Sequence, residues 1–194
     1  MKVAVLIDGG HLRVLVKGRA RRKYRPDYIE KVAHACIAHD ETLYRVFHYD
    51  CLPFNGVGRL PVSGREHRFT GSGEWLRDLE RRDYFALRMG VLKFRGFKPK
   101  RVPIPDADLT DDDFQPDFEQ KGVDMRIGLD IATFAATNAV DRIVLVTNDT
   151  DCIPAMKYGR RGGLQIVLVG FPGHGAAREL LPHVDFHRQI DWPD

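Results

Sequence analysis

The sequence predicts an α/β protein, a three-layer sandwich around a mostly parallel sheet, in one domain over residues 1–194. Two observations carry this prediction. Apolar runs of strand length recur at residues 2–7, 143–146 and 164–169, as is typical of strands covered on both faces. Segments with helical periodicity lie between these runs, and alternating strands and helices favour a parallel sheet.

In the first half of the chain, proline and glycine residues mark the boundaries between the expected elements. The expected elements, in order, are a strand at 2–7, a short helix at 12–16, a basic loop at 17–25, a helix from Pro26, and a strand at 42–49. Residues 50–73 are rich in glycine and are expected to be irregular. A third helix is expected around 75–85, ended by Gly90, followed by a strand at 91–97.

Residues 98–120 are rich in proline and aspartate and lack periodicity, so we interpret them as a second long insertion. A helix follows from Lys121, because its apolar stripe has helical spacing at Ile127, Ile131, Phe134 and Ala135. The remaining expected elements are a strand at 143–146, a helix at 154–161, a strand at 164–169, a short helix at 176–181, and an edge strand at 184–190.

The composition argues against a membrane-spanning protein, a secreted protein and a zinc-binding protein. The net charge is +3, and no apolar run approaches the roughly 20 residues that a membrane span needs. The opening apolar run is too short for a signal peptide and leads into Asp8. The three cysteines lie far apart and form no zinc motif, so a cytoplasmic protein without membrane contact is expected.

Aspartates follow two of the predicted parallel strands. Asp8 ends the first strand, Asp149 and Asp151 follow the strand at 143–146, and Asp124 opens the central helix. Because right-handed crossovers bring the carboxyl ends of parallel strands to one edge, we expect these acids to lie together. Helix capping alone would need a single aspartate at each turn.

Carboxylates that converge in this way repel one another unless a cation lies between them. An all-oxygen set suits Mg²⁺ or Mn²⁺ better than zinc. Such an ion activates water and neutralises a phosphate, so the predicted reaction is metal-assisted hydrolysis of a phosphodiester bond.

The chain resembles an NYN domain of the LabA-like group, within the PIN-like nuclease superfamily. Asp8-Gly9-Gly10 resembles the family's DGSN motif, and Lys121-Gly122-Val123-Asp124 followed by Asp130 resembles its KGVD-helix-D motif. Residues 147–151, TNDTD, resemble its SGDSD motif. The resemblance implies a PIN-like sandwich, a metal-dependent ribonuclease activity, and metal ligation by Asp8, Asp124, Asp149 and Asp151.

The sequence departs from the family pattern near these acids. Gly10 stands where the family has Ser, and His11 where it has Asn, while Thr147-Asn148 replaces Ser-Gly. We expect His11 and Asn148 to position the phosphate, with Thr147 beside the acids. For Asp130, a supporting role behind the metal ligands and an ordinary helix-surface position with Arg126 remain open alternatives.

Candidate RNA contacts are cationic or aromatic. The basic loop offers phosphate contacts and a stacking face at Tyr24, and further cations lie near the acidic turns. Each of these side chains has an equally ordinary role as a solvated surface group. The set is Arg19, Arg21, Arg22, Lys23, Tyr24, Lys121, Lys157 and Arg160.

The favoured function is therefore a Mg²⁺- or Mn²⁺-dependent ribonuclease, an endonuclease on single-stranded RNA, with structured RNA also open as a partner. Two alternatives remain. One is an inactive domain of the same fold that binds RNA or protein, suggested by His11 and the long insertions. The other is a structure-specific DNA nuclease. A homo-oligomer is left open. The acidic run from Asp106 to Glu119 is either a solvated loop or a screen over the site.

Overall fold

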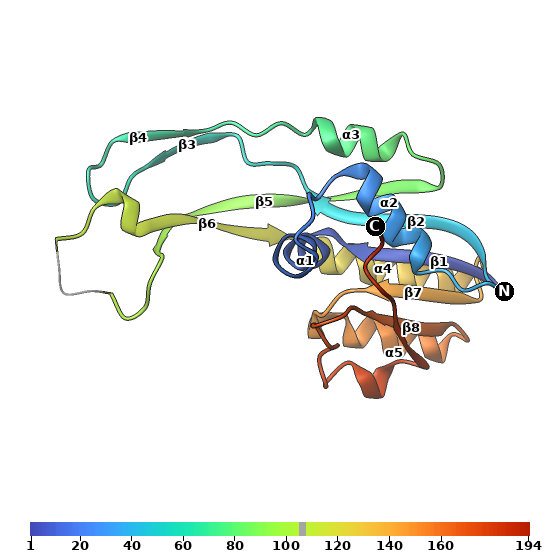
Figure 1. Cartoon of the computed structure of the whole chain (residues 1–194). Helices are drawn as coiled ribbons and strands as arrows, with labels where there is room; N and C mark the ends of the chain where they lie inside the picture. Colours follow the sequence, from blue (N-terminus) through green and yellow to red (C-terminus); the bar gives the residue numbers. More distant parts are fainter. Residues whose placement is uncertain (105–107) are drawn as a thin grey trace.

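The computed structural model describes residues 1–104 and 108–194 and contains a seven-stranded sheet (Figure 1). The strand order is β6-β5-β2-β1-β7-β8-β9. All neighbouring strands are parallel except β5 and β6, which confirms the predicted α/β fold. The strands are β1 Lys2–Asp8, β2 Thr42–Cys51, β5 Phe85–Pro99, β6 Phe114–Lys121, β7 Arg142–Val146, β8 Gln165–Gly170 and β9 Phe186–Gln189.

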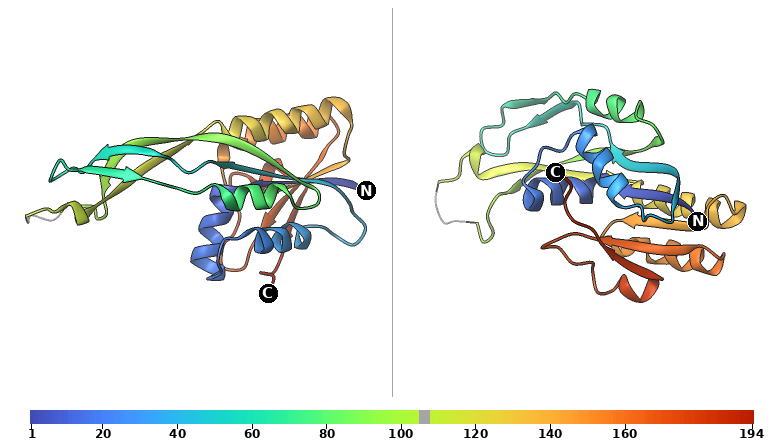
Figure 2. Two further views of the ribbon diagram at one scale, coloured as in Figure 1. Left: turned by 90° about the horizontal axis from the view of Figure 1, so that it is seen from above. Right: turned by 45° about the vertical axis from the view of Figure 1, so that its right-hand side comes forward.

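Helices cover both faces of the sheet, giving three layers (Figure 2). On one face lie α1 Gly9–Leu15, α2 Pro26–Ala35 and α3 Glu74–Glu80; on the other lie α4 Val123–Thr137 and α5 Ile153–Arg161. Alternate residues of β1 point to opposite layers, Val5 to the first core and Leu6 to the second. Both faces of the strand are thus buried, as the continuous apolar run indicated.

The central helix has the predicted core-facing stripe. Ile127, Ile131 and Phe134 are buried on α4, while Ala135 is partly buried beside them. Full burial of side chains of this size stabilises a fold by about 1.5–3 kcal/mol each. This stripe fixes the rotation of α4, and therefore the direction in which Asp124 in its first turn points. None of the described helices combines the length and the apolar character needed to cross a membrane.

The largest differences from expectation lie in an arm that projects from the sheet (Figures 1 and 2). We define the arm as residues 56–69, 91–99 and 114–121. The segment 50–73 holds a hairpin of β3 Gly56–Arg59 and β4 Glu66–Phe69. The segment 98–120 contains β6, and Gly90 lies inside β5 rather than at the end of a helix.

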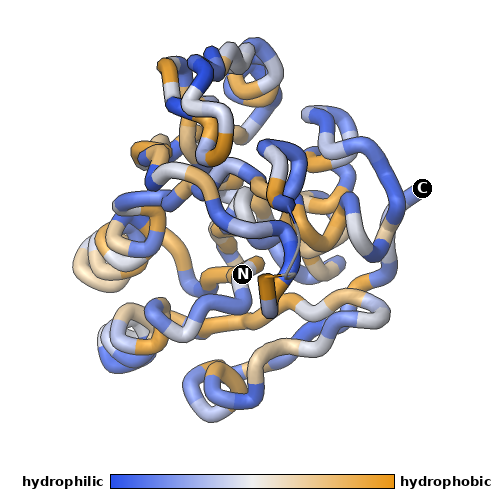
Figure 3. Tube along the Cα trace, turned by 90° about the vertical axis from the view of Figure 1, so that its left-hand side faces the viewer, coloured by the Kyte–Doolittle hydropathy of each residue, from blue (hydrophilic) through white to orange (hydrophobic). Residues whose placement is uncertain are grey.

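Aromatic packing explains why the arm is ordered. The Phe94 ring lies 4.9 Å from Phe69 and 5.6 Å from both Phe54 and Phe118, measured between ring centroids. These partners are distant in sequence, so local periodicity gives no sign of them. Seen from the side of the arm, the trace mixes hydrophobic and hydrophilic residues, as strands with one packed and one exposed face require (Figure 3).

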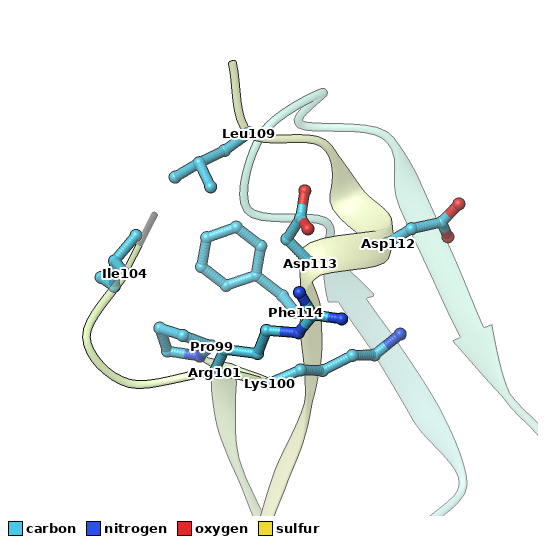
Figure 4. Close-up of a pocket in the computed structure, with 8 residues that line it drawn as sticks. All are labelled: Pro99, Lys100, Arg101, Ile104, Leu109, Asp112, Asp113 and Phe114. Atoms are coloured by element: carbon cyan, nitrogen blue, oxygen red, sulfur yellow. The ribbon is translucent and has the colours of Figure 1, made fainter. Parts of the chain in front are cut away.

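The acidic run lies toward the end of the arm. Asp111 accepts hydrogen bonds from the backbone N–H groups of Val62 and Ser63, and Asp117 pairs with Lys98 at 2.5 Å. Pro99, Ile104, Leu109 and Phe114 line a cavity of about 320 Å³ at the tip (Figure 4). Asp106 lies outside the described residues. These contacts tie the described part of the run to the arm, rather than placing it as a screen over the predicted acids.

Two shorter segments also differ from expectation. Val16–Ala20 continues α1 as a π-helical turn, so only 21–25 of the predicted basic loop is irregular. The predicted helix at 176–181 is replaced by a turn at 178–180, followed by a 3₁₀ turn at Leu181–His183. Pro182 removes a helical donor there, and the N–H of Ala177 is donated to Asn148 instead.

Candidate metal centre

The predicted acids meet at the carboxyl edge of the sheet. In the register of β1 and β7, Ile7 lies beside Val146, so the residues that follow each strand emerge together. Asp8 follows Ile7 directly, and Asp149 comes three residues after Val146. Asp124 reaches the same place from the first turn of α4. All three line one cavity of about 550 Å³.

Three of the four acids form a tight cluster. Asp124, Asp149 and Asp151 each offer a carboxylate oxygen, and these oxygens all lie within 4.8 Å of one another. Asp8 is outside this cluster, although it lines the same cavity. Its oxygens accept hydrogen bonds from the backbone N–H of His11 at 3.1 Å and from the Thr147 hydroxyl at 3.2 Å. Asp8 is therefore both the cap of α1 and the innermost carboxylate of the site.

Thr147 links the two acidic turns. Its buried hydroxyl donates to Asp8 and accepts the N–H of Asp149 at 3.2 Å. Asp149 in turn accepts the N–H of Asp151 through Oδ1 at 2.8 Å. Capping therefore occupies only one oxygen of Asp149, because its Oδ2 accepts no hydrogen bond from the described residues. Thr147 therefore lies in contact with both Asp8 and Asp149.

The pKa of Asp124 shows that the negative charges of the cluster are not matched by positive charge. Burial raises the pKa of Asp124, and the charges of Asp149, Asp8 and Asp151 raise it further. The same surroundings act on a neighbouring thiol, since burial and then Asp149 raise the pKa of Cys152 to about 12. A bound cation would reverse this cost for Asp124. The donor set consists of oxygens alone, which fits Mg²⁺ or Mn²⁺.

The rim of the cavity holds the residues that depart from the family pattern. A Cβ on Gly10 would lie 2.6 Å from Oε1 of Gln120, so Gln120 fills the space that a serine side chain would need. The His11 and His174 rings lie tilted by 50° with centroids 5.6 Å apart, and burial lowers the pKa of His11. Asn148 lines the cavity, with its side-chain nitrogen 3.4 Å from His174.

Asp130 does not pair with Arg126, the partner considered in the sequence analysis. It accepts hydrogen bonds from the Tyr49 hydroxyl at 2.7 Å and from Nε of Arg88 at 2.8 Å, whereas Arg126 bonds the Gly122 carbonyl. These contacts fasten α4 to β2 and β5. Asp130 thus supports the helix that carries Asp124, one turn and a half further along.

The predicted RNA contacts fall into two groups. Arg19, Arg21, Arg22, Lys23 and Lys157 are exposed, and Lys121 is exposed beside Glu119 with an ion pair between them. Arg160 and Tyr24 differ. Arg160 pairs with Asp185 at 3.0 Å, and Asp185 also accepts a hydrogen bond from the N–H of Ile166. Ile166 lies at the start of β8, so this ion pair is at the opposite edge of the sheet from the acids. Tyr24 is no free stacking face, because its ring packs edge-on against Trp75 and its hydroxyl donates to the Gly9 carbonyl.

Sequence reasoning missed Asp50, Gln120 and His174. Asp50 lies near the carboxyl end of β2 as Asp8 lies at the carboxyl end of β1, and this repeated position was a signal that could have found it. It is fully buried and pairs with Arg13. Although burial opposes its ionisation, the hydrogen bond from His48 and the charge of Arg13 lower the pKa of Asp50. Gly9 packs so closely here that a Cβ would lie 2.8 Å from Asp50.

A mostly parallel sheet with acidic turns gathered at its carboxyl edge is consistent with a PIN-like fold. The comparison with protein families agrees: residues 83–190 match the NYN domain. This match covers more than half of the chain, so the chain belongs to the NYN family, within the PIN-like superfamily. Asp8 lies before the matched region, yet β1 lies in the same sheet as β7.

Two further comparisons concern whole proteins. The crystal structure of a protein of unknown function from Vibrio parahaemolyticus superposes with a TM-score of 0.56 at 17% identity, covering 98% of this chain and 93% of that one. At this identity the likeness supports the fold alone. No curated protein sequence matches the chain.

Proposed function

We propose that this NYN protein is a Mg²⁺- or Mn²⁺-dependent ribonuclease that cuts single-stranded RNA internally. The observation that carries the proposal is the convergence of Asp124, Asp149 and Asp151 within 4.8 Å. These acids come from two separate segments, the first turn of α4 and the turn that follows β7, and capping accounts for only one of their oxygens. The family is one of nucleases, which favours phosphodiester hydrolysis as the reaction.

In this proposal Asp124, Asp149 and Asp151 hold the divalent ion, and Asp8 completes the negative wall of the cavity. A bound ion would lower the pKa of a coordinated water and neutralise the phosphate. Thr147 keeps Asp8 and Asp149 in fixed relative positions. His11 and Asn148 line the entrance and orient the phosphate. The leaving group is the 3′ oxygen. Three buried free thiols fit a reducing cytoplasm as the compartment.

The decisive experiment measures cleavage of a labelled single-stranded RNA with Mn²⁺, with and without EDTA. Asp149→Asn should reduce cleavage at least about a hundredfold, because a metal ligand contributes several kcal/mol to the transition state and each 1.4 kcal/mol is tenfold. The matched control is Asp78→Asn, which removes an exposed acid on α3 and should cleave normally.

Each alternative gives a different result in the same assay. Unchanged cleavage by Asp149→Asn would remove the assignment of the metal ligands. Binding of RNA without turnover by the wild-type protein would favour the regulatory module, the alternative that His11 suggested. Cleavage of a matched DNA strand at an equal rate would favour the DNA nuclease, since the 2′-hydroxyl distinguishes the two substrates.

A further inference from the structure

A second cavity lies next to the metal centre, on the adjacent face of α1. Gly10, His11 and Val14 of this helix line the metal cavity, whereas Arg13 lines the second one, and Lys17 of the following turn joins it. The second cavity measures about 310 Å³. We call it the aromatic cavity, and its lining residues are Arg13, Lys17, Tyr24, Cys51, Pro53, Trp75 and Leu92.

Gln120 and Asp50 form the wall between the two cavities. Gln120 lines the metal cavity, and its side-chain nitrogen lies 3.5 Å from Oδ1 of Asp50. The other oxygen of Asp50 is paired with Arg13, which lines the aromatic cavity. A chain of three side chains in contact, Gln120, Asp50 and Arg13, therefore leads from one cavity to the other.

The lining of the aromatic cavity combines flat apolar surface with positive charge. Tyr24 and Trp75 meet edge to face with centroids 5.6 Å apart, and Leu92 and Pro53 add aliphatic surface. The Arg13 guanidinium lies 5.2 Å from the Tyr24 centroid and 5.7 Å from that of Trp75. Arg13 is held in this position by buried Asp50, so its plane is fixed before any ligand arrives.

A nucleobase suits this lining better than a purely apolar or purely anionic ligand. Bases stack on aromatic rings and on guanidinium planes, while the phosphate attached to them is attracted by cations. Lys17 is exposed at this cavity and offers that attraction. The volume is at the lower end of the range for small-ligand sites, which suits one base.

We propose that the aromatic cavity holds the base of the nucleotide next to the scissile phosphate, stacked against the surface that Trp75 and the Arg13 guanidinium form together. The proposal rests on the proposed ribonuclease function and adds a base-binding subsite to it. It also gives Tyr24 a role that differs from the stacking face expected from sequence: its edge braces Trp75. A subsite beside the metal centre would fix the register of the strand at the point of cleavage.

The first test measures the fluorescence of Trp75. The chain has two tryptophans, and Trp192 stacks on Phe171 at 4.3 Å near the C-terminus, so Trp192→Phe leaves Trp75 as the single reporter. A short oligouridylate, added in EDTA to prevent cleavage, should change the emission of Trp75. An abasic oligonucleotide of equal length should leave the emission unchanged and bind at least about tenfold more weakly, because stacking is lost.

The second test uses variants in the cleavage assay. Trp75→Leu should raise KM about tenfold with kcat nearly unchanged, whereas Trp75→Phe, which keeps a ring, should restore most of the loss. Asp78→Asn on the same helix serves as the control. Circular dichroism establishes that each variant is folded, and the fluorescence test needs no change at Trp75.

The two tests separate failure of the subsite from failure of the ribonuclease function. Equal binding of the two oligonucleotides, with Trp75 emission unchanged, would overturn the subsite even if the protein cuts RNA. A base-dependent change in Trp75 emission would support the subsite even if the protein does not cut.

Discussion

Buried acids have opposite surroundings at the amino and carboxyl ends of the parallel strands. At the amino edge, Glu41 is buried between Arg142 at 2.6 Å and Arg188 at 2.7 Å. At the carboxyl edge, Asp124 has three other carboxylates as the charges that shift it. Both edges are built from the ends of the same parallel strands, so the difference lies in the side chains and not in the backbone.

The pKa directions express this difference. Burial opposes the ionisation of Glu41, but hydrogen bonds from Arg188, Ala38 and Arg142 lower its pKa to about 2. Burial and neighbouring acids instead raise the pKa of Asp124. Acids matched by cations stabilise the fold, whereas acids left unmatched at a cavity indicate a ligand. Asp50 shows that both situations occur at the carboxyl edge, because Arg13 neutralises it close to the candidate metal centre.

The largest expected effect on stability comes from removing the charge of Glu41 at the amino edge. Glu41→Gln should lower the free energy of unfolding by about 3–5 kcal/mol, because it leaves two arginines without their shared carboxylate. Denaturant unfolding at neutral pH measures this change. The control is Asp27→Asn, since Asp27 forms an exposed pair with Arg82 and should cost no more than about 1 kcal/mol.

Acid should abolish the same difference between wild type and Glu41→Gln. The folded pKa of Glu41 is depressed, so its contribution is present above its ordinary pKa of 4.5 and is lost as the pH falls toward about 2. A gap between the two proteins that stays constant from pH 6 to pH 2 would contradict the role assigned to this carboxylate.

The next largest effect is expected when a divalent ion binds at the carboxyl edge, where the acids lack matching cations. Mn²⁺ at a hundred times its Kd should raise the free energy of unfolding by about 2.7 kcal/mol, because it binds the folded state. Thermal unfolding with and without the ion measures the shift in Tm. The shift should vanish in Asp149→Asn and persist in Asp78→Asn. An equal shift in all three proteins would mean that the ion binds elsewhere.

The smallest expected effect is a gain. Without metal, Asp124→Asn should stabilise the protein by about 1 kcal/mol, since it removes one of the mutually repelling charges at a functional site. Denaturant unfolding in EDTA provides the measurement. Destabilisation of the folded state by this change would show that Asp124 serves the fold rather than a ligand.

The parts of the fold that were predictable from sequence are those set by local pattern. The buried runs of β1 and β7 and the stripe of α4 indicate their own structures, and parallel topology then brings Asp8, Asp124 and Asp149 to one edge. The sequence does not indicate that Asp8 lies outside the tight cluster of Asp124, Asp149 and Asp151, because a spacing does not specify side-chain direction.

The arm was not predictable in the same way. Phe54, Phe69, Phe94 and Phe118 stabilise it through contacts between distant parts of the chain. Glycines suggested irregular structure, although Gly58 lies in β3 where a Cβ would meet the Phe94 ring at 2.7 Å. Likewise, only the folded chain shows that Arg13, Asp50 and Gln120 form a wall between two cavities.

The junction at Gly122 has a mechanical consequence. Gly122 alone separates the end of β6 from the start of α4, and it adopts a left-handed conformation with φ of 76°. A side chain at this position would strain the backbone, because the left-handed region favours glycine. The backbone angles of this single residue therefore set how Asp124, in the first turn of α4, is placed relative to the arm.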